Sequence, residues 1–94
     1  MNAIAALRKH ENTIKERYHV KKIGVFGSFA RGEEKAESDI DVLVEFEADY
    51  ETFDNYMDLK FFLEDLFGRN VDLVTIDALR PQLKDAILSQ VSYA

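Results

Sequence analysis

The run of residues 38–46 constrains the fold most strongly, because apolar and polar side chains alternate along it with a period of two. The apolar set is Ile40, Val42, Val44 and Phe46, and the alternate set is Asp39, Asp41, Leu43 and Glu45. Successive side chains of a β-strand leave opposite faces of the sheet. The run therefore predicts a strand with one apolar face and one acidic face.

Two further β-rich runs, residues 20–26 and 71–76, lie before and after this strand, and helical periodicity fills the segments between them. Residues 2–18 predict a first amphipathic helix, residues 53–67 predict another that ends before Gly68, and Pro81 opens a last one. A short helix is expected from near Ser28, capped by that serine after a sharp turn at Gly27, to about residues 32–34. This order predicts an α/β (α+β) fold, a small mixed β-sheet with helices packed on it.

The sequence also predicts which face of each helix packs against the sheet. The first helix carries Ile4, Leu7, Ile14 and Tyr18, and the last carries Leu83, Ile87, Leu88 and Val91. The aromatic set of the third helix is larger than one core-facing stripe needs, so most of it is expected in the core and a residual exposed patch would suit a partner helix or a second copy of the chain. That set is Phe53, Tyr56, Phe61, Phe62 and Phe67.

Composition narrows the classes of function. The 94 residues support one compact domain, residues 1–94, that buries roughly 60–65% of the surface of its unfolded chain. The net charge of −6 argues against a surface that follows long nucleic acid, which needs clustered Lys and Arg. There is no cysteine, only His10 and His19 could serve zinc, and no apolar stretch has membrane-spanning length. We expect a cytoplasmic protein without disulfides, zinc or membrane.

Three acids form the candidate centre. Asp39 and Asp41 are two apart on the predicted strand, so both carboxylates leave the same face, with Cα atoms about 6.5–7 Å apart. Asp72 lies in the next β-rich run and joins them if the two strands pair. Three acids on one face repel each other without a cation, and Mg²⁺ prefers oxygen ligands and is usually completed by substrate phosphates.

The turn at Gly27 and Ser28 supplies the other half of the candidate site. A strand that turns into a helix N-terminus presents backbone N–H groups and a hydroxyl, which favour a triphosphate. A second Mg²⁺ roughly 3.5–4 Å from the first would stabilise the attacking and leaving oxygens of phosphoryl-type transfer. Each feature alone has an ordinary structural interpretation. The acids could simply form a solvent-exposed face of the strand, and the turn could simply cap a helix. Together they predict an ATP or other NTP site with catalytic, metal-binding Asp39, Asp41 and Asp72.

These motifs resemble a known family. Gly27-Ser28, ten residues and then Asp39-Ile40-Asp41 is similar to the signature of the DNA polymerase beta-like nucleotidyltransferase superfamily, and residues 20–91 resemble its minimal nucleotidyltransferase (MNT) branch. The resemblance implies that the acids matching Asp39 and Asp41 bind both metals and that the one matching Asp72 assists the catalytic metal and the nucleophile. One departure is Glu33-Glu34, where relatives are often basic.

The resemblance also implies a partner. MNT proteins of the HEPN/MNT toxin–antitoxin type pair with HEPN-type helical toxins, some of which they inactivate by transferring AMP to a tyrosine. The alternative is a non-catalytic, nucleotide-binding antitoxin that acts by contact. A self-sufficient small-molecule or RNA nucleotidyltransferase is a third reading, which the short chain disfavours.

Further polar residues have open roles. Arg31 could pair with an acid of the domain or bind a phosphate as part of the nucleotide site. Glu45 shares the acidic face but lies further along the strand, so we expect an exposed role. His10 and His19 are expected at the surface or at helix ends.

Overall fold

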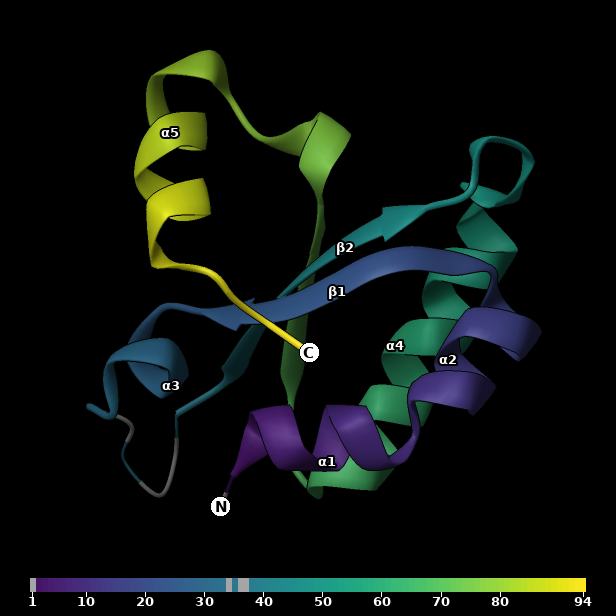
Figure 1. Cartoon of the computed structure of the whole chain (residues 1–94), viewed down its shortest axis with the longest axis horizontal. Coiled ribbons are helices and arrows are strands. Elements are labelled where there is room, and N and C mark those ends of the chain that lie inside the picture. The colour runs from purple at the N-terminus through teal and green to yellow at the C-terminus, as the bar shows by residue number, and fades with distance from the viewer. Residues whose placement is uncertain (1, 34, 36–37) are drawn as a thin grey trace.

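A computed structural model of the chain describes residues 2–33, 35 and 38–94. Four strands form one mixed sheet in the order β3-β2-β1-β4 (Figure 1). In the centre, β1 (Val20–Phe26) pairs antiparallel with β2 (Ile40–Phe46), and β3 (Val71–Thr75) pairs parallel with β2. The mixed sheet confirms the predicted fold class. The fourth strand, β4 (Ser92–Tyr93), was not predicted because two residues carry no readable period.

One face of the sheet is covered by three helices, α1 (Ala3–Lys9), α2 (Glu11–Tyr18) and α4 (Phe53–Phe67). The single helix predicted for residues 2–18 is wrong, because the chain breaks at His10, which has φ −107° and ψ 17°. The His10 ring meets the edge of Phe62 on α4, with ring centroids 6.0 Å apart. The break lets two short helices follow the twisted sheet.

The main core lies between these helices and the apolar side of the strands. Its fully buried members come from the helices and the sheet, namely Leu7, Ile14, Val25, Ile40, Val42, Val44, Leu59 and Leu63. The α4 aromatics divide as predicted. Phe67 is buried and Tyr56 and Phe62 pack against the core, whereas Phe53 and Phe61 are exposed.

The opposite face carries less cover. The short helix α3 (Ser28–Arg31) follows β1, and α5 (Pro81–Gln90) precedes β4. In Figure 1, α5 stands apart from α1, α2 and α4, and the yellow chain end returns across β1. No residue of α5 is buried, and of the predicted apolar stripe Val91, just after the helix, lies against the sheet at Gly24. Residue 34, within the range predicted for the end of α3, lies outside the described residues.

The prediction that this face is simply acidic needs correction at Leu43, which is fully buried. Leu43 lies opposite Gly24 on β1 and Val74 on β3. A Cβ added at Gly24 would lie 2.6 Å from Cγ1 of Val91, so the missing side chain lets the C-terminal segment lie against the sheet here. The middle of the face is therefore apolar and covered, and its acids lie to either side.

The remaining connections are short. Two 3₁₀ turns, η1 (Ala48–Tyr50) and η2 (Ile76–Ala78), follow β2 and β3. The third strand consequently ends at Thr75, one residue before the predicted limit. None of the described helices has the length and apolar character needed to cross a membrane.

Candidate active site

Two of the three predicted acids meet across neighbouring strands. The parallel register of β2 and β3 sets Asp41 directly opposite Asp72, which confirms that the two strands pair side by side. Asp39 is not part of β2, contrary to the prediction, because the strand begins at Ile40. It lies just before the strand and is exposed, as is Asp72, whereas Asp41 is half-buried.

The charges of these acids influence one another. Partial burial raises the pKa of the Asp41 carboxyl above its usual range, and the negative charges of Asp72 and Asp39 raise it further. A hydrogen bond between Asp41 and Asp72 acts in the same direction, and nearby Arg31 opposes it. Asp41 thus stands in a negative field that a cation would relieve.

The Asp72 charge is also felt on the side of β3 that faces α4. Burial raises the pKa of the Tyr56 hydroxyl, and the charge of Asp72 adds to this shift. That hydroxyl donates a hydrogen bond to the carbonyl oxygen of Leu73. The charge of Asp72 therefore acts on Asp41 of β2 and also on Tyr56 of α4.

The glycine turn lies against the same acids. Gly27 has φ 70° and ψ −147°, a conformation that glycine alone adopts readily. A Cβ built on Gly27 would collide with the carboxylate of Asp41. The prediction that Ser28 caps the helix is wrong. Gly27 occupies the cap position and Ser28 is the first helical residue, so the hydroxyl is left for other partners.

Arg31 ends α3 near the acids, and the structure shows the first of its two predicted uses. Its Nε donates to Oε2 of Glu33 at 3.1 Å and its Nη1 donates to Oε1 of Gln90 at 3.3 Å. Glu33 is one of the two acids that depart from the family pattern. The same contacts bring α5 beside the turn.

Sequence reasoning missed Arg69, which positions the segment before Asp39. Its Nη1 donates to the carbonyl oxygen of Ser38 at 3.2 Å, and its guanidinium lies 5.1 Å from the ring centroid of Phe29 on α3. The residue thus ties the start of β2 to the helix that follows the glycine turn. Only the pairing of distant segments reveals this, since no local pattern marks Arg69.

The donor set fits Mg²⁺. Carboxylate oxygens are its preferred protein ligands, and the structure places Asp41 and Asp72 together beside a backbone turn. Among the residues that the structure describes, no three His, Asp or Glu side chains are gathered closely enough to hold a metal ion.

Of the other polar candidates, the two histidines lie at helix ends, as predicted, whereas the exposed position predicted for Glu45 is wrong. His10 caps the junction of α1 and α2. His19 ends α2 and stacks on Tyr50, with ring centroids 3.6 Å apart. Glu45 is half-buried on the far half of β2.

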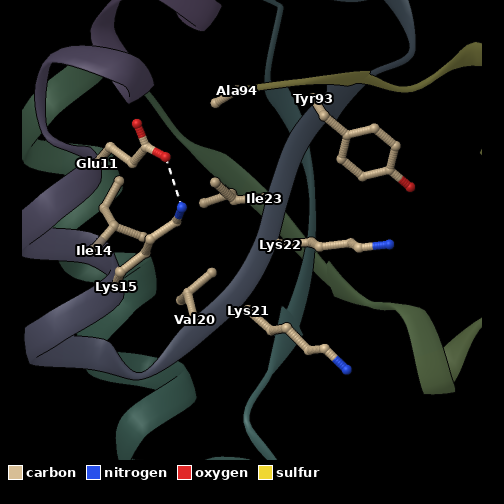
Figure 2. A pocket seen from close by; sticks show the side chains of 9 residues that line it. All are labelled: Glu11, Ile14, Lys15, Val20, Lys21, Lys22, Ile23, Tyr93 and Ala94. Carbon is tan, nitrogen blue, oxygen red and sulfur yellow. Dashed lines mark hydrogen bonds and ion pairs between the residues drawn. The ribbon is translucent and has the colours of Figure 1, made fainter.

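A partly open hollow of about 190 Å³ lies elsewhere, between α2 and the start of β1. Figure 2 shows Ile14, Val20 and Ile23 directed toward it, whereas Lys22 and Tyr93 point to the other side of the strand. The hollow holds no acid pair, and Glu11 there is already bonded to Lys15. This hollow therefore does not mark the site, and the chemistry of the acids does.

A mixed sheet with paired acids on adjoining strands and a glycine turn against them defines the class of nucleotidyltransferases. The family model of the nucleotidyltransferase domain matches residues 7–93, and the chain belongs to that family.

Named proteins with similar sequences narrow the comparison further. The chain is 45% identical over 89 residues to a candidate protein adenylyltransferase of Methanocaldococcus jannaschii, covering 93% of this chain and 89% of the relative. It is 40% identical over 87 residues to the protein adenylyltransferase MntA of Thermococcus cleftensis, covering 93% and 87%.

Solved structures agree. A candidate minimal nucleotidyltransferase has a TM-score of 0.81 and 34% identity, covering 98% of this chain and 95% of its own. A structure of the toxin–antitoxin pair MntA–HpeT has a TM-score of 0.66 and 25% identity, covering 97% and 67%. The chain is thus similar to nucleotidyltransferases of the minimal type.

Proposed function

We propose that this chain transfers AMP from ATP to the hydroxyl of a side chain, a tyrosine, on a HEPN-type helical toxin. The chain would thereby act as the antitoxin of that protein. The observation that carries the proposal is the pairing of Asp41 with Asp72 across β2 and β3, with the backbone of Gly27 against the Asp41 carboxylate. Contact alone would not require that arrangement. The names of the relatives, protein adenylyltransferases and MntA, support the choice of AMP and of a protein acceptor.

In this proposal Asp39, Asp41 and Asp72 hold Mg²⁺, and a pair of ions would neutralise the triphosphate and lower the pKa of the attacking hydroxyl. The turn at Gly27 and Ser28 holds phosphate oxygens through backbone N–H groups and the free hydroxyl. Arg31 exchanges its contact with Glu33 for a phosphate when ATP binds.

The transfer itself is a substitution at the α-phosphorus. The acceptor oxygen forms a new bond to that phosphorus, the bond to the bridging oxygen of the β-phosphate breaks, and pyrophosphate leaves. The hydroxyl proton passes to the carboxylates beside it and on to water. Asp72 and the neighbouring carboxylates set the electrostatic potential at the attacking oxygen of the acceptor.

Mass spectrometry tests the reaction. The HEPN-type toxin incubated with this chain, ATP and Mg²⁺ should gain about 329 Da per AMP, a figure set by nucleotide chemistry. The double variant Asp39→Asn with Asp41→Asn should add nothing. A toxin that loses activity without added mass would identify the contact antitoxin instead.

Thermal unfolding tests binding without an acceptor. Mg²⁺ and ATP together should raise the midpoint more than either alone, by about 2.7 kcal/mol of stability at 100 times the Kd. The double variant should lose this gain. Glu45→Gln, on the same strand, is the matched control and should keep it, and equal gains in all three proteins would place the nucleotide elsewhere.

A cytoplasmic location belongs to the same proposal, because ATP is available there.

A further inference from the structure

A groove of about 370 Å³, here named the β3 groove, lies at the end of β3 beside the first turn of α4. Phe53, Tyr56, Leu73, Val74, Thr75 and Ala78 line it. It is mainly apolar and lies outside the acid pair. Its position at the edge of the sheet gives another chain access to it.

The first part of the β3 edge is already occupied by α4. The backbone N–H of Val71 donates to Oε2 of Glu64 at 3.2 Å, and the Leu73 carbonyl accepts from the Tyr56 hydroxyl. Past Leu73 the strand opens into the groove. Phe53, at the start of α4, lines this opening with 76% of its surface exposed. An aromatic ring so placed offers apolar area to an incoming side chain.

The β3 groove lies near the candidate active site, because Val74, one of the residues that line it, follows Asp72 by two positions on β3. Val74 leaves the same face of β3 as Asp72, about 6.5–7 Å further along the strand. On β2 the same step leads from Asp41, opposite Asp72, to Leu43, opposite Val74. A chain bound beside Val74 therefore lies two residues along β3 from Asp72, the acid that we assign to the nucleophile.

Charge selects the kind of chain that fits. Glu51 lines the groove, and three further acids, Asp54, Asp72 and Asp77, are neighbours of lining residues in sequence. One base, Lys21, lies with Glu51 and Asp77 around an adjoining hollow, so the acids outnumber it. Such a rim repels the triphosphate of ATP and attracts lysine or arginine. A second copy of this chain, with its net charge of −6, would be disfavoured for the same reason.

We propose that the β3 groove binds the acceptor segment of the partner protein, a basic segment with an apolar side chain against Phe53 that brings the hydroxyl residue to Asp72. This inference rests on the proposed function and names how its acceptor is recognised. The groove, rather than the acids, then sets which hydroxyl receives the nucleotide.

Binding of two synthetic tyrosine peptides tests the proposal without requiring transfer. The peptides have the same leucines and differ only in whether lysine or glutamate flanks the tyrosine. By fluorescence polarisation the wild-type chain should bind the lysine peptide at least about tenfold more tightly than the glutamate peptide. Phe53→Ala should weaken that binding about tenfold, whereas Phe61→Ala, exposed on the same helix outside the groove, should change it less than about twofold. Glu51→Lys should reduce the preference for the lysine peptide.

The outcomes separate this proposal from the function on which it rests. Equal binding by Phe53→Ala and wild type, no preference between the peptides, or no binding of either would overturn the groove assignment. If Phe53→Ala also adenylylates the toxin with an unchanged KM, the groove is excluded while the transfer activity stands. Peptide binding that needs Phe53, in a chain that adds no mass to any acceptor, would uphold the groove and reject the enzyme.

Discussion

The two faces of the sheet differ in what covers them. One face packs against α1, α2 and α4 and buries Val42 and Val44 completely. The other carries Asp41 and Asp72, and the C-terminal segment covers β1 beside the buried Leu43. Stability is therefore concentrated on one face and the candidate chemistry on the other. Substitutions on the two faces should accordingly affect different measurements.

The largest expected effect falls on the helix-covered face. Leu63→Ala deletes a fully buried side chain between α4 and the sheet, and should lower the free energy of unfolding by about 2–5 kcal/mol. Leu83→Ala is the control, because Leu83 on α5 is 52% exposed, and should change it by less than about 0.5 kcal/mol. Urea unfolding of both variants measures the difference. Similar losses would show that α5 contributes to the core as much as α4 does.

A smaller effect is expected at the glycine turn. Gly27→Ala combines backbone strain of about 1–3 kcal/mol with a collision against Asp41, and should weaken ATP binding at least about tenfold. Gly32→Ala is the control for a left-handed glycine without a collision, because Gly32 has φ 70° and ψ 23°, a less strained conformation than that of Gly27, and open space around it. Calorimetry should find wild-type ATP affinity for Gly32→Ala. Equal affinities for the two variants would mean that the turn does not touch the phosphates.

The smallest effect is expected at Glu33. Glu33→Gln removes the charge that pairs with Arg31, so the guanidinium becomes available to phosphate and ATP affinity should rise about twofold, or about 0.4 kcal/mol. Glu16→Gln, exposed on α2, is the matched control. An affinity that falls or stays constant would leave Arg31 as a structural residue.

Much of the fold could be predicted because local patterns match the final elements. β1 and α4 have the predicted limits, since a β-rich run and a helical stripe each end at a glycine. The break at His10 and the buried Leu43 could not be predicted. His10 contacts Phe62, and Gly24, opposite Leu43, lies against Val91; only the folded chain brings these residues, distant in the sequence, together.

The candidate site was predictable in part for the same reason. The spacing of Asp39 and Asp41 is local, and the pairing of Asp72 with Asp41 required only that β2 and β3 be neighbours. The role of Arg69 is not local, because it bonds to Ser38. The metal, the roles of the site residues and the single domain stay predictions.

The most direct test of the central claim, that Asp72 acts with Asp41 in one centre, pairs ATP titration with the transfer assay on Asp72→Asn. The variant should keep most of its ATP affinity, since Asp39 and Asp41 remain. Its transfer rate should fall at least about 100-fold, or about 2.7 kcal/mol of barrier, because the lost carboxylate acts mainly in the transition state. The unfolding midpoint should not fall, because the substitution removes one of the charges that raise the pKa of Asp41. Unimpaired transfer by Asp72→Asn would remove Asp72 from the centre and contradict the account.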